Sequence, residues 1–199
     1  DMVKADCGGC NGCSRCCHGM GNSIILDPYD VYRMTTGMGK SMQELLAASV
    51  ELNVVDGVIL PNLKMQGTEE ACAYLDEEGR CSIHPYRPGI CRLFPLGRYY
   101  ENGGFSYFLQ TGECAKENRS KIKVSKWIDT PDLTRNQQFT LQWHDLLHAM
   151  EERLTGEDEG KQREENLLLL RLFYLLPYEG TIDFYTQFTE RMEHWNGQI

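Results

Sequence analysis

Five cysteines lie in the stretch Cys7-Gly8-Gly9-Cys10-Asn11-Gly12-Cys13-Ser14-Arg15-Cys16-Cys17. Disulfides usually join segments that are distant in sequence, whereas cysteines spaced three residues apart can bind one metal centre together. Thiolates are soft ligands that suit zinc, iron and iron–sulfur clusters, while calcium and magnesium prefer oxygen ligands. This stretch therefore predicts a soft-metal site around which the first part of the chain folds.

The other four cysteines, at positions 72, 81, 91 and 114, bring the total to nine, and none follows residue 114. An odd number of cysteines favours metal ligation over a disulfide framework. Eight thiolates would fill two four-thiolate sites and leave one ligand over; the alternative is one cluster plus several inert buried thiols. The side chains of the adjacent Cys16 and Cys17 are expected to diverge and to serve two different sites.

The type of metal is only partly indicated by the spacing. Cys7, Cys10 and Cys13 reproduce the C-x2-C-x2-C start of bacterial ferredoxin ligation, which favours an iron–sulfur cluster. The same spacing occurs in zinc sites, so Zn²⁺ is the alternative cofactor. His144 and His148, four residues apart, could grip a metal from one helix, but without a glutamate at the second position of the motif we favour a polar helix face.

Charge and hydropathy exclude several functional classes. The chain has 199 residues, with 20 basic and 29 acidic side chains and a net charge of −9. We therefore expect no nucleic-acid binding, which depends on clustered Lys and Arg. We also expect no membrane span, because no window of about 18 uninterrupted apolar residues occurs. Because residues 1–6 lack the pattern of a signal peptide, we expect a cytoplasmic protein.

Five arginines near cysteines are expected to offset the thiolate charge: Arg15, Arg80, Arg87, Arg92 and Arg98.

The chain has two regions that differ in composition and in the spacing of apolar residues, and together they predict an α+β fold. We expect a cysteine-cluster metal-binding domain at residues 1–115, followed by a helical extension at 116–199 packed on it. In the first region we expect helices at 27–37 and 41–54, strands at 57–63 and 104–110, and a hairpin at 73–83 with its turn at 77–80. In the extension we expect helices at 131–154, 162–176 and 181–195. The middle one is apolar nearly all round, which predicts burial, or else contact with the first region or with a second copy in a homodimer. The last shows one stripe: Ile182, Tyr185, Phe188, Met192 and Trp195.

Four segments carry a resemblance to a known family: residues 10–17 (CNGCSRCC), 72–76 (CAYLD), 79–84 (GRCSIH) and 87–95 (RPGICRLFP). They closely resemble the CxxCxxCC cysteine-cluster proteins, the YkgJ-like family, described as zinc- or iron-chelating. The resemblance covers residues 10 to about 115. This family is similar to the cysteine-rich part of flagellin lysine N-methylase, for which an iron–sulfur cluster is implied.

The resemblance implies ligand roles for Cys10, Cys13, Cys16, Cys17, Cys72, Cys81, Cys91 and Cys114. Cys7 is additional to the family pattern, and we include it among the metal ligands. His84 stands where the family usually has tyrosine; we favour an ordinary surface histidine over a nitrogen ligand. Ala115-Lys116 replaces the usual Pro-Gly after the last cysteine.

We interpret the protein as an electron-transfer module or a cluster-dependent modifying enzyme that acts with a redox or protein partner. Methyl transfer to protein lysine rests on family analogy alone. The alternative is a zinc-stabilised protein-interaction module.

Overall fold

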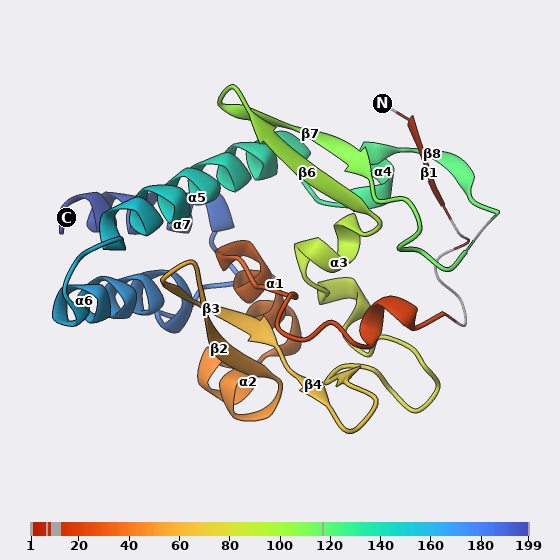
Figure 1. Cartoon of the computed structure of the whole chain (residues 1–199), viewed down its shortest axis with the longest axis horizontal. Coiled ribbons are helices and arrows are strands. Elements are labelled where there is room, and N and C mark those ends of the chain that lie inside the picture. Colours follow the sequence, from red (N-terminus) through yellow and green to blue (C-terminus); the bar gives the residue numbers. More distant parts are fainter. Residues whose placement is uncertain (1, 7, 9–12, 117, 199) are drawn as a thin grey trace.

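The computed structural model describes residues 2–6, 8, 13–116 and 118–198 (Figure 1). In this part of the chain the strands form four antiparallel pairs: β1 (Met2–Asp6) with β8 (Ser120–Lys123), β2 (Val50–Val55) with β3 (Val58–Leu63), β4 (Met65–Gln66) with β5 (Ala71–Cys72), and β6 (Leu96–Glu101) with β7 (Gly104–Leu109). The helices are α1 (Pro28–Met38), α2 (Met42–Ala48), α3 (Gly89–Leu93), α4 (Val124–Ile128), α5 (Leu133–Leu154), α6 (Glu159–Leu170) and α7 (Phe184–Asn196). Two 3-10 turns, η1 (Arg15–Cys17) and η2 (His84–Tyr86), and a π-helical turn, η3 (Arg171–Leu175), complete the set. The predicted α+β class with a helical C-terminal part is confirmed.

The first two helices begin at the residues that the sequence indicates. The Asp27 carboxylate accepts the backbone N–H of Asp30 at 2.8 Å, and the Asp30 carboxylate accepts the N–H of Asp27 at 3.2 Å. Ser41 and Glu44 form the same reciprocal capping box at the start of α2. A cap of this kind stabilises a helix by about 1 kcal/mol. The predicted helix starts at 27 and 41 are therefore confirmed, and α1 ends at Met38, just before Gly39, whose φ of 64° suits glycine. The second helix was predicted to run to 54, which is wrong: it ends at Ala48, and strand β2 begins at Val50.

Two hairpins owe their register to two-residue turns with positive φ. In the β2–β3 hairpin the turn is Asp56-Gly57, with φ values of 50° and 84°, and the strands pair from Val55↔Val58 to Val50↔Leu63. In the β6–β7 hairpin the turn is Asn102-Gly103, with φ values of 51° and 70°. Asp-Gly and Asn-Gly favour this tight turn, because their backbone conformation matches the twist of the flanking strands. The strands predicted at 57–63 and 104–110 are confirmed.

The predicted hairpin at 73–83 is wrong in its strands and right in its turn. The Asp76 carboxylate accepts the N–H of Glu78 at 3.0 Å and of Arg80 at 2.7 Å, which closes the turn. Only the isolated bridge Leu75↔Cys81 joins the two arms, while Cys72 pairs with Met65 in β4 instead. Pro85 and Pro88 lack the N–H that a longer ladder would need, and the chain enters η2 at His84.

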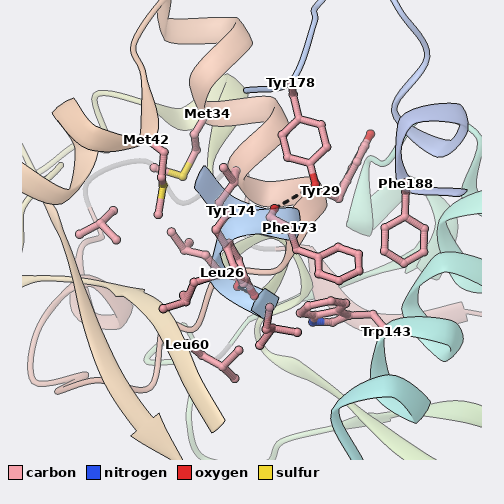
Figure 2. Packing of buried hydrophobic residues seen from close by; sticks show 14 of the residues in the cluster. Leu26, Tyr29, Met34, Met42, Leu60, Trp143, Phe173, Tyr174, Tyr178 and Phe188 are labelled. Carbon is pink, nitrogen blue, oxygen red and sulfur yellow. Dashed lines mark hydrogen bonds between the residues drawn. The ribbon is translucent and has the colours of Figure 1, made fainter. Parts of the chain in front are cut away.

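The helices of the second half pack against α1 and the β2–β3 hairpin around one hydrophobic core (Figure 2). The core joins Leu26 and Met34 from the first half with Trp143, Phe173 and Phe188 from the second. Its aromatic rings meet mostly edge to face, as Trp143 and Phe173 do at a centroid distance of 5.1 Å. Residues on both sides of position 115 therefore share one core, while the domain boundary at 115/116 stays a prediction.

The predicted apolar helices differ from the observed ones in detail. In α7, Phe188 and Trp195 are buried as expected, but Ile182 precedes the helix and is 41% exposed. Phe184 and Arg191 take up the buried face instead, because the helix starts two residues later than position 182. The middle helix buries Leu169 and Phe173 completely, yet Leu167 is 55% exposed and its first half is polar, so the predicted burial holds for one face only.

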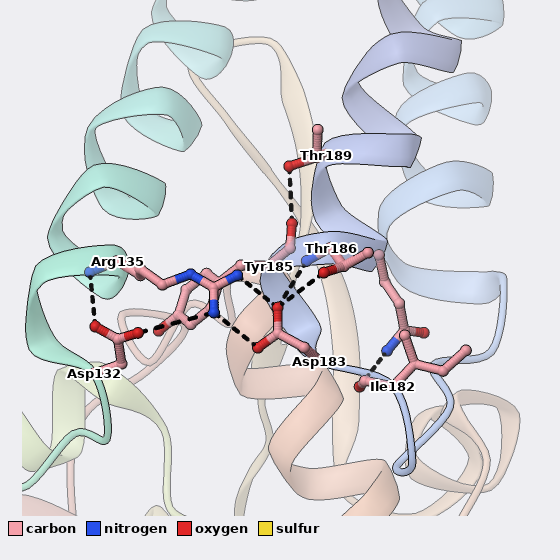
Figure 3. Close-up of polar contacts among 8 residues, drawn as sticks. Asp132, Arg135, Ile182, Asp183, Tyr185, Thr186 and Thr189 are labelled. Atoms are coloured by element: carbon pink, nitrogen blue, oxygen red, sulfur yellow. Dashed lines mark hydrogen bonds and ion pairs between the residues drawn. The ribbon is translucent and has the colours of Figure 1, made fainter.

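An ion-pair cluster joins the start of α5 to the start of α7 (Figure 3). The guanidinium of Arg135 donates to both oxygens of the Asp183 carboxylate, at 3.2 and 2.6 Å, and lies over the Tyr185 ring at 4.6 Å. The same carboxylate caps α7 by accepting the N–H of Thr186 at 3.0 Å. Because these groups are nearly half exposed, the pair contributes at most about 1 kcal/mol.

A buried tyrosine ties η3 to the segment before α1. The Tyr174 hydroxyl donates to the Leu26 carbonyl at 3.0 Å, and both residues are at most 1% exposed. We expect Tyr174→Phe to lower the free energy of unfolding by about 1–2 kcal/mol, because the buried carbonyl loses its partner. Urea unfolding followed by circular dichroism measures this change, with Tyr99→Phe, at an exposed position, as the control. Equal stability of the two variants would show that the Leu26 carbonyl finds another partner.

The cysteine-bearing segments lie away from the long helices. In Figure 1, α6 and α7 lie at one end of the molecule and α5 runs from that end toward the middle, whereas α3 lies near the middle, and η1 and the loop after β4 lie beyond it on the other side. Across residues 2–6, 8, 13–116 and 118–198, no helix combines the length and the apolar character that crossing a bilayer requires. The fold thus presents its cysteines at one end of a core that is built largely by other elements.

Candidate metal site

Five thiols line one partly open cavity of about 900 Å³, which we call the thiol cavity. Its cysteines come from four places in the sequence: η1, β5, the turn after Arg80, and α3. All five are partly buried. The structure thus brings together more than half of the cysteines predicted to bind metal: Cys16, Cys17, Cys72, Cys81 and Cys91.

Cys91 is positioned by a buried carboxylate on α1. The Asp30 side chain accepts the N–H of Gly89 at 2.6 Å, and Arg92 Nη2 lies 3.9 Å from the same carboxylate. Asp30 and Arg92 are 2% and 4% exposed, and Arg92 also donates to the Thr130 hydroxyl at 2.8 Å. The capping box that starts α1 therefore also fixes the short helix that carries Cys91.

The other thiols are brought together by short backbone bridges. The bridge His18↔Ala71 and the hydrogen bond from the Gly19 N–H to the Glu70 carbonyl, at 3.0 Å, join the segment after η1 to β5. The bridge Leu75↔Cys81 and the Asp76 turn then fold the next cysteine back toward the cavity. Each of these contacts involves only a few backbone atoms. Backbone pairing, rather than a large packed surface, therefore places these thiols.

Cys16 and Cys17 were expected to diverge, but both face the thiol cavity and their thiols are hydrogen-bonded to each other. The Cys17 thiol donates to Cys16, and this hydrogen bond is the largest cause, with nearby Arg87 and His18 as smaller ones, that lowers the pKa of Cys16 to about 6. The pKa of Cys17 is raised by the same hydrogen bond and by burial. The tight 3-10 turn at residues 15–17 brings the two side chains together.

Burial raises the pKa values of the remaining three thiols. For Cys72, Cys81 and Cys91 the loss of hydration is the largest cause, and neighbouring thiols add to it. Asp30 raises the pKa of Cys91 further. A cation at this position would favour the thiolate forms, because metal ligation deprotonates cysteine and releases protons. The set of donors fits a soft, positively charged metal centre.

A second, smaller group of thiols lies next to the first. Cys13, Cys16 and Cys114 line a cavity of about 30 Å³ together with Trp127 and Lys116. The Trp127 indole donates to the carbonyls of Leu93 and Phe94, both at 3.2 Å, which fixes this wall. Cys16 lines both cavities, so the two groups adjoin.

The remaining predicted residues divide as follows. Cys7 and Cys10 lie outside the described residues. His84 is exposed, with its Nε2 atom 2.8 Å from Arg87 Nη1, and it lines neither cavity. His144 stacks on Tyr100 at a centroid distance of 3.8 Å on the surface of α5, and with His148 it makes no part of the site. Arg15 and Arg87 line the thiol cavity, whereas Arg92 lies against Asp30.

The five thiols share a cavity, but they do not all point at one ion-sized position. In the part of the chain that the structure describes, no three His, Cys, Asp or Glu side chains are arranged to hold a single metal ion. The five thiols surround a space much larger than one ion needs, since a zinc–sulfur bond is about 2.3 Å long. The described thiols therefore line one space without converging on one point.

Sequence reasoning missed the other wall of the thiol cavity. Ile24, Leu63, Tyr74 and Ile83 from the core, with Leu96 from a second buried cluster, line the cavity together with the thiols. It also missed Asp30, whose role in the capping box conceals its contact with Gly89. No pattern in the sequence indicates either feature, because both arise from elements far apart in the chain.

The model of one protein family matches residues 9–140 of the chain. That family is named CxxCxxCC and described as a "putative zinc- or iron-chelating domain". The match continues beyond residue 115 into α5 and includes every described cysteine. No curated protein and no solved structure shows significant similarity to the chain.

Proposed function

The chain belongs to the CxxCxxCC family and so has a metal-binding role, and from this premise we propose that its thiol cavity holds an iron–sulfur cluster used for electron transfer. The family description allows zinc or iron. The choice between them depends on how the thiols are arranged, and on what each metal requires of its ligands.

One observation carries the proposal: five thiols share a cavity, while no three described His, Cys, Asp or Glu side chains are arranged to hold one ion. A structural zinc ion needs four ligands at about 2.0–2.3 Å from one atom. A four-iron cluster is bound by four thiolates in total, so its ligands surround a wider space. The spread of thiols around a large cavity supports a cluster over a single zinc ion.

The two thiol groups suggest an assignment of ligands. Cys17, Cys72, Cys81 and Cys91 line only the thiol cavity and make a set of four, the number that a cluster takes. Cys16 adjoins Cys13 and Cys114 around a space of about 30 Å³, which has room for no more than one small ion. We assign these three to a second thiol group, and ligand roles for Cys7 and Cys10 stay predictions.

Bound iron–sulfur clusters transfer single electrons at potentials that the protein sets through burial, charge and hydrogen bonds to sulfur. Here the cavity wall next to the thiols is largely apolar and buried, and Arg87 and His18 supply positive charge near Cys16. The open side of the cavity leaves a path for a redox partner.

The test is an absorption spectrum with iron, zinc and sulfide quantitation on the full chain purified without oxygen. We expect brown protein with iron and acid-labile sulfide in comparable amounts, and little zinc. Removing the metal with an iron chelator under reducing conditions should remove the colour and lower the melting temperature, since metal binding stabilises the folded state. Colourless protein with zinc and no sulfide would refute the proposal and favour a zinc-stabilised module.

A further inference from the structure

The thiol cavity is larger than its proposed inorganic occupant requires. Its volume of about 900 Å³ lies within the range of roughly 300–1,000 Å³ that organic ligand pockets occupy. A single ion with bonds of about 2.3 Å to sulfur takes on the order of 50 Å³ of that space. A cluster takes more, yet it lies against the thiols that bind it, and other residues line the rest of the cavity.

Part of the remaining lining is apolar and well buried. Ile24, Leu63 and Ile83 belong to the main core, Leu96 belongs to the second buried cluster, and all four are at most 5% exposed. The cavity thus lies where two hydrophobic clusters meet, which is a common location for ligand pockets. An apolar surface of this kind is stabilised by contact with hydrocarbon rather than with an inorganic centre.

The charged groups of the cavity differ in burial. Arg87 and His18 are half-buried, whereas Glu69 and Glu113 are exposed at the rim together with Arg15. Among the described residues, no carboxylate forms an ion pair with Arg87, and its one hydrogen bond goes to the His84 ring. A guanidinium has five N–H donors and matches a carboxylate with two parallel hydrogen bonds. Arg87 therefore has donors left for an anion inside the cavity.

We propose that the thiol cavity binds a small organic acid with an apolar body, its carboxylate at Arg87 and its hydrocarbon against Ile24, Leu63 and Leu96. This inference rests on the proposed function, because it places the ligand beside the metal centre. The ligand would be the substrate of that centre or an organic molecule that occupies the cavity with it.

The test measures binding of octanoate to the full, metal-loaded chain by isothermal titration calorimetry without oxygen. Octyltrimethylammonium, with the same hydrocarbon chain and the opposite charge, is the matched probe. We expect one octanoate per chain, bound at least about tenfold more tightly than the cation, since a charged hydrogen bond of this kind is worth about 1.5–3 kcal/mol. Arg87→Met should weaken octanoate binding about tenfold, and its iron and sulfide content is measured in parallel. Arg163→Met, an exposed position on α6, removes the same charge and should change neither.

The outcomes separate the two proposals. Loaded protein that holds iron and sulfide but binds neither probe, or binds both equally, overturns this inference and leaves the proposed function intact. If Arg87→Met loses iron and sulfide while octanoate binding is unchanged, Arg87 serves the metal centre and the inference is wrong. If the unmutated protein contains no iron or sulfide, the proposed function is refuted, regardless of its affinity for octanoate.

Discussion

Cys91→Ser should lose at least about nine tenths of its iron, sulfide and visible absorption, while Cys114→Ser should keep most of them. Cys91 is one of the four thiols that line only the thiol cavity, whereas Cys114 lines the smaller cavity with Cys13 and Cys16. Serine is a poor ligand for a soft metal, and loss of a supporting residue alone costs 10–100-fold in metal affinity. Loss of a direct ligand is expected to cost at least as much.

Two further measurements keep this comparison informative. Met65→Leu alters the same cavity without removing a thiol and should retain the cluster. Far-ultraviolet circular dichroism should be unchanged in Cys91→Ser, because Cys91 packs only at the edge of the main core and serine is close to it in size. Equal loss of iron from Cys91→Ser and Cys114→Ser would place both thiols in one centre. Full retention by Cys91→Ser would exclude Cys91 as a ligand.

Arg191→Met should lower the free energy of unfolding by about 4 kcal/mol, the largest change that we expect from a residue outside the site. Arg191 is 5% exposed and donates to the carbonyls of Leu172, Leu176 and Pro177 at 2.7, 3.0 and 2.8 Å. Its guanidinium also lies 3.5 Å from the centre of the Tyr178 ring. These carbonyls belong to η3 and the turn after it. The last carbonyls of a helix have no helical N–H group to accept from, so they need another donor. Each buried carbonyl left without a partner costs about 1–3 kcal/mol.

Urea unfolding at fixed metal content measures the effect of Arg191→Met. Arg191→Lys should be almost as unstable, since one ammonium group cannot reproduce the planar fork that reaches three carbonyls. Arg163→Met on the exposed face of α6 should change the free energy of unfolding by no more than about 0.5 kcal/mol. A loss below about 1 kcal/mol in Arg191→Met would show that water reaches the end of η3.

The sequence predicted most of the local structure, because that structure depends on local chemistry. The N-cap at Asp27, the capping box at Ser41 and the turn at 77–80 were visible as residue patterns, and the helix starts and the turn follow them. The π-helical turn was not visible, since it depends on how Tyr174 reaches the Leu26 carbonyl. Ile182 was misplaced because helical spacing alone does not fix where a helix begins.

The site was predictable in its residue types and not in its arrangement. Cysteine spacing indicated a soft-metal centre, and the family match supports a metal-binding role. Spacing could not show that Cys16 and Cys17 face the same cavity, because the 3-10 turn that aligns them is fixed by tertiary contacts such as His18↔Ala71. Nor could it show the apolar wall, whose residues come from several elements of two hydrophobic clusters.

The shared core also has a consequence for the order of events during synthesis. Phe188 and Trp195 complete the core, and 81 residues separate Trp195 from Cys114. At about 5–20 residues per second, a ribosome adds that stretch in roughly 4 to 16 s. Throughout this interval all nine cysteines have been translated but the core that supports the thiol cavity is incomplete. Oxidants and metal ions in the compartment therefore compete for unprotected thiols on the nascent chain before the cavity exists.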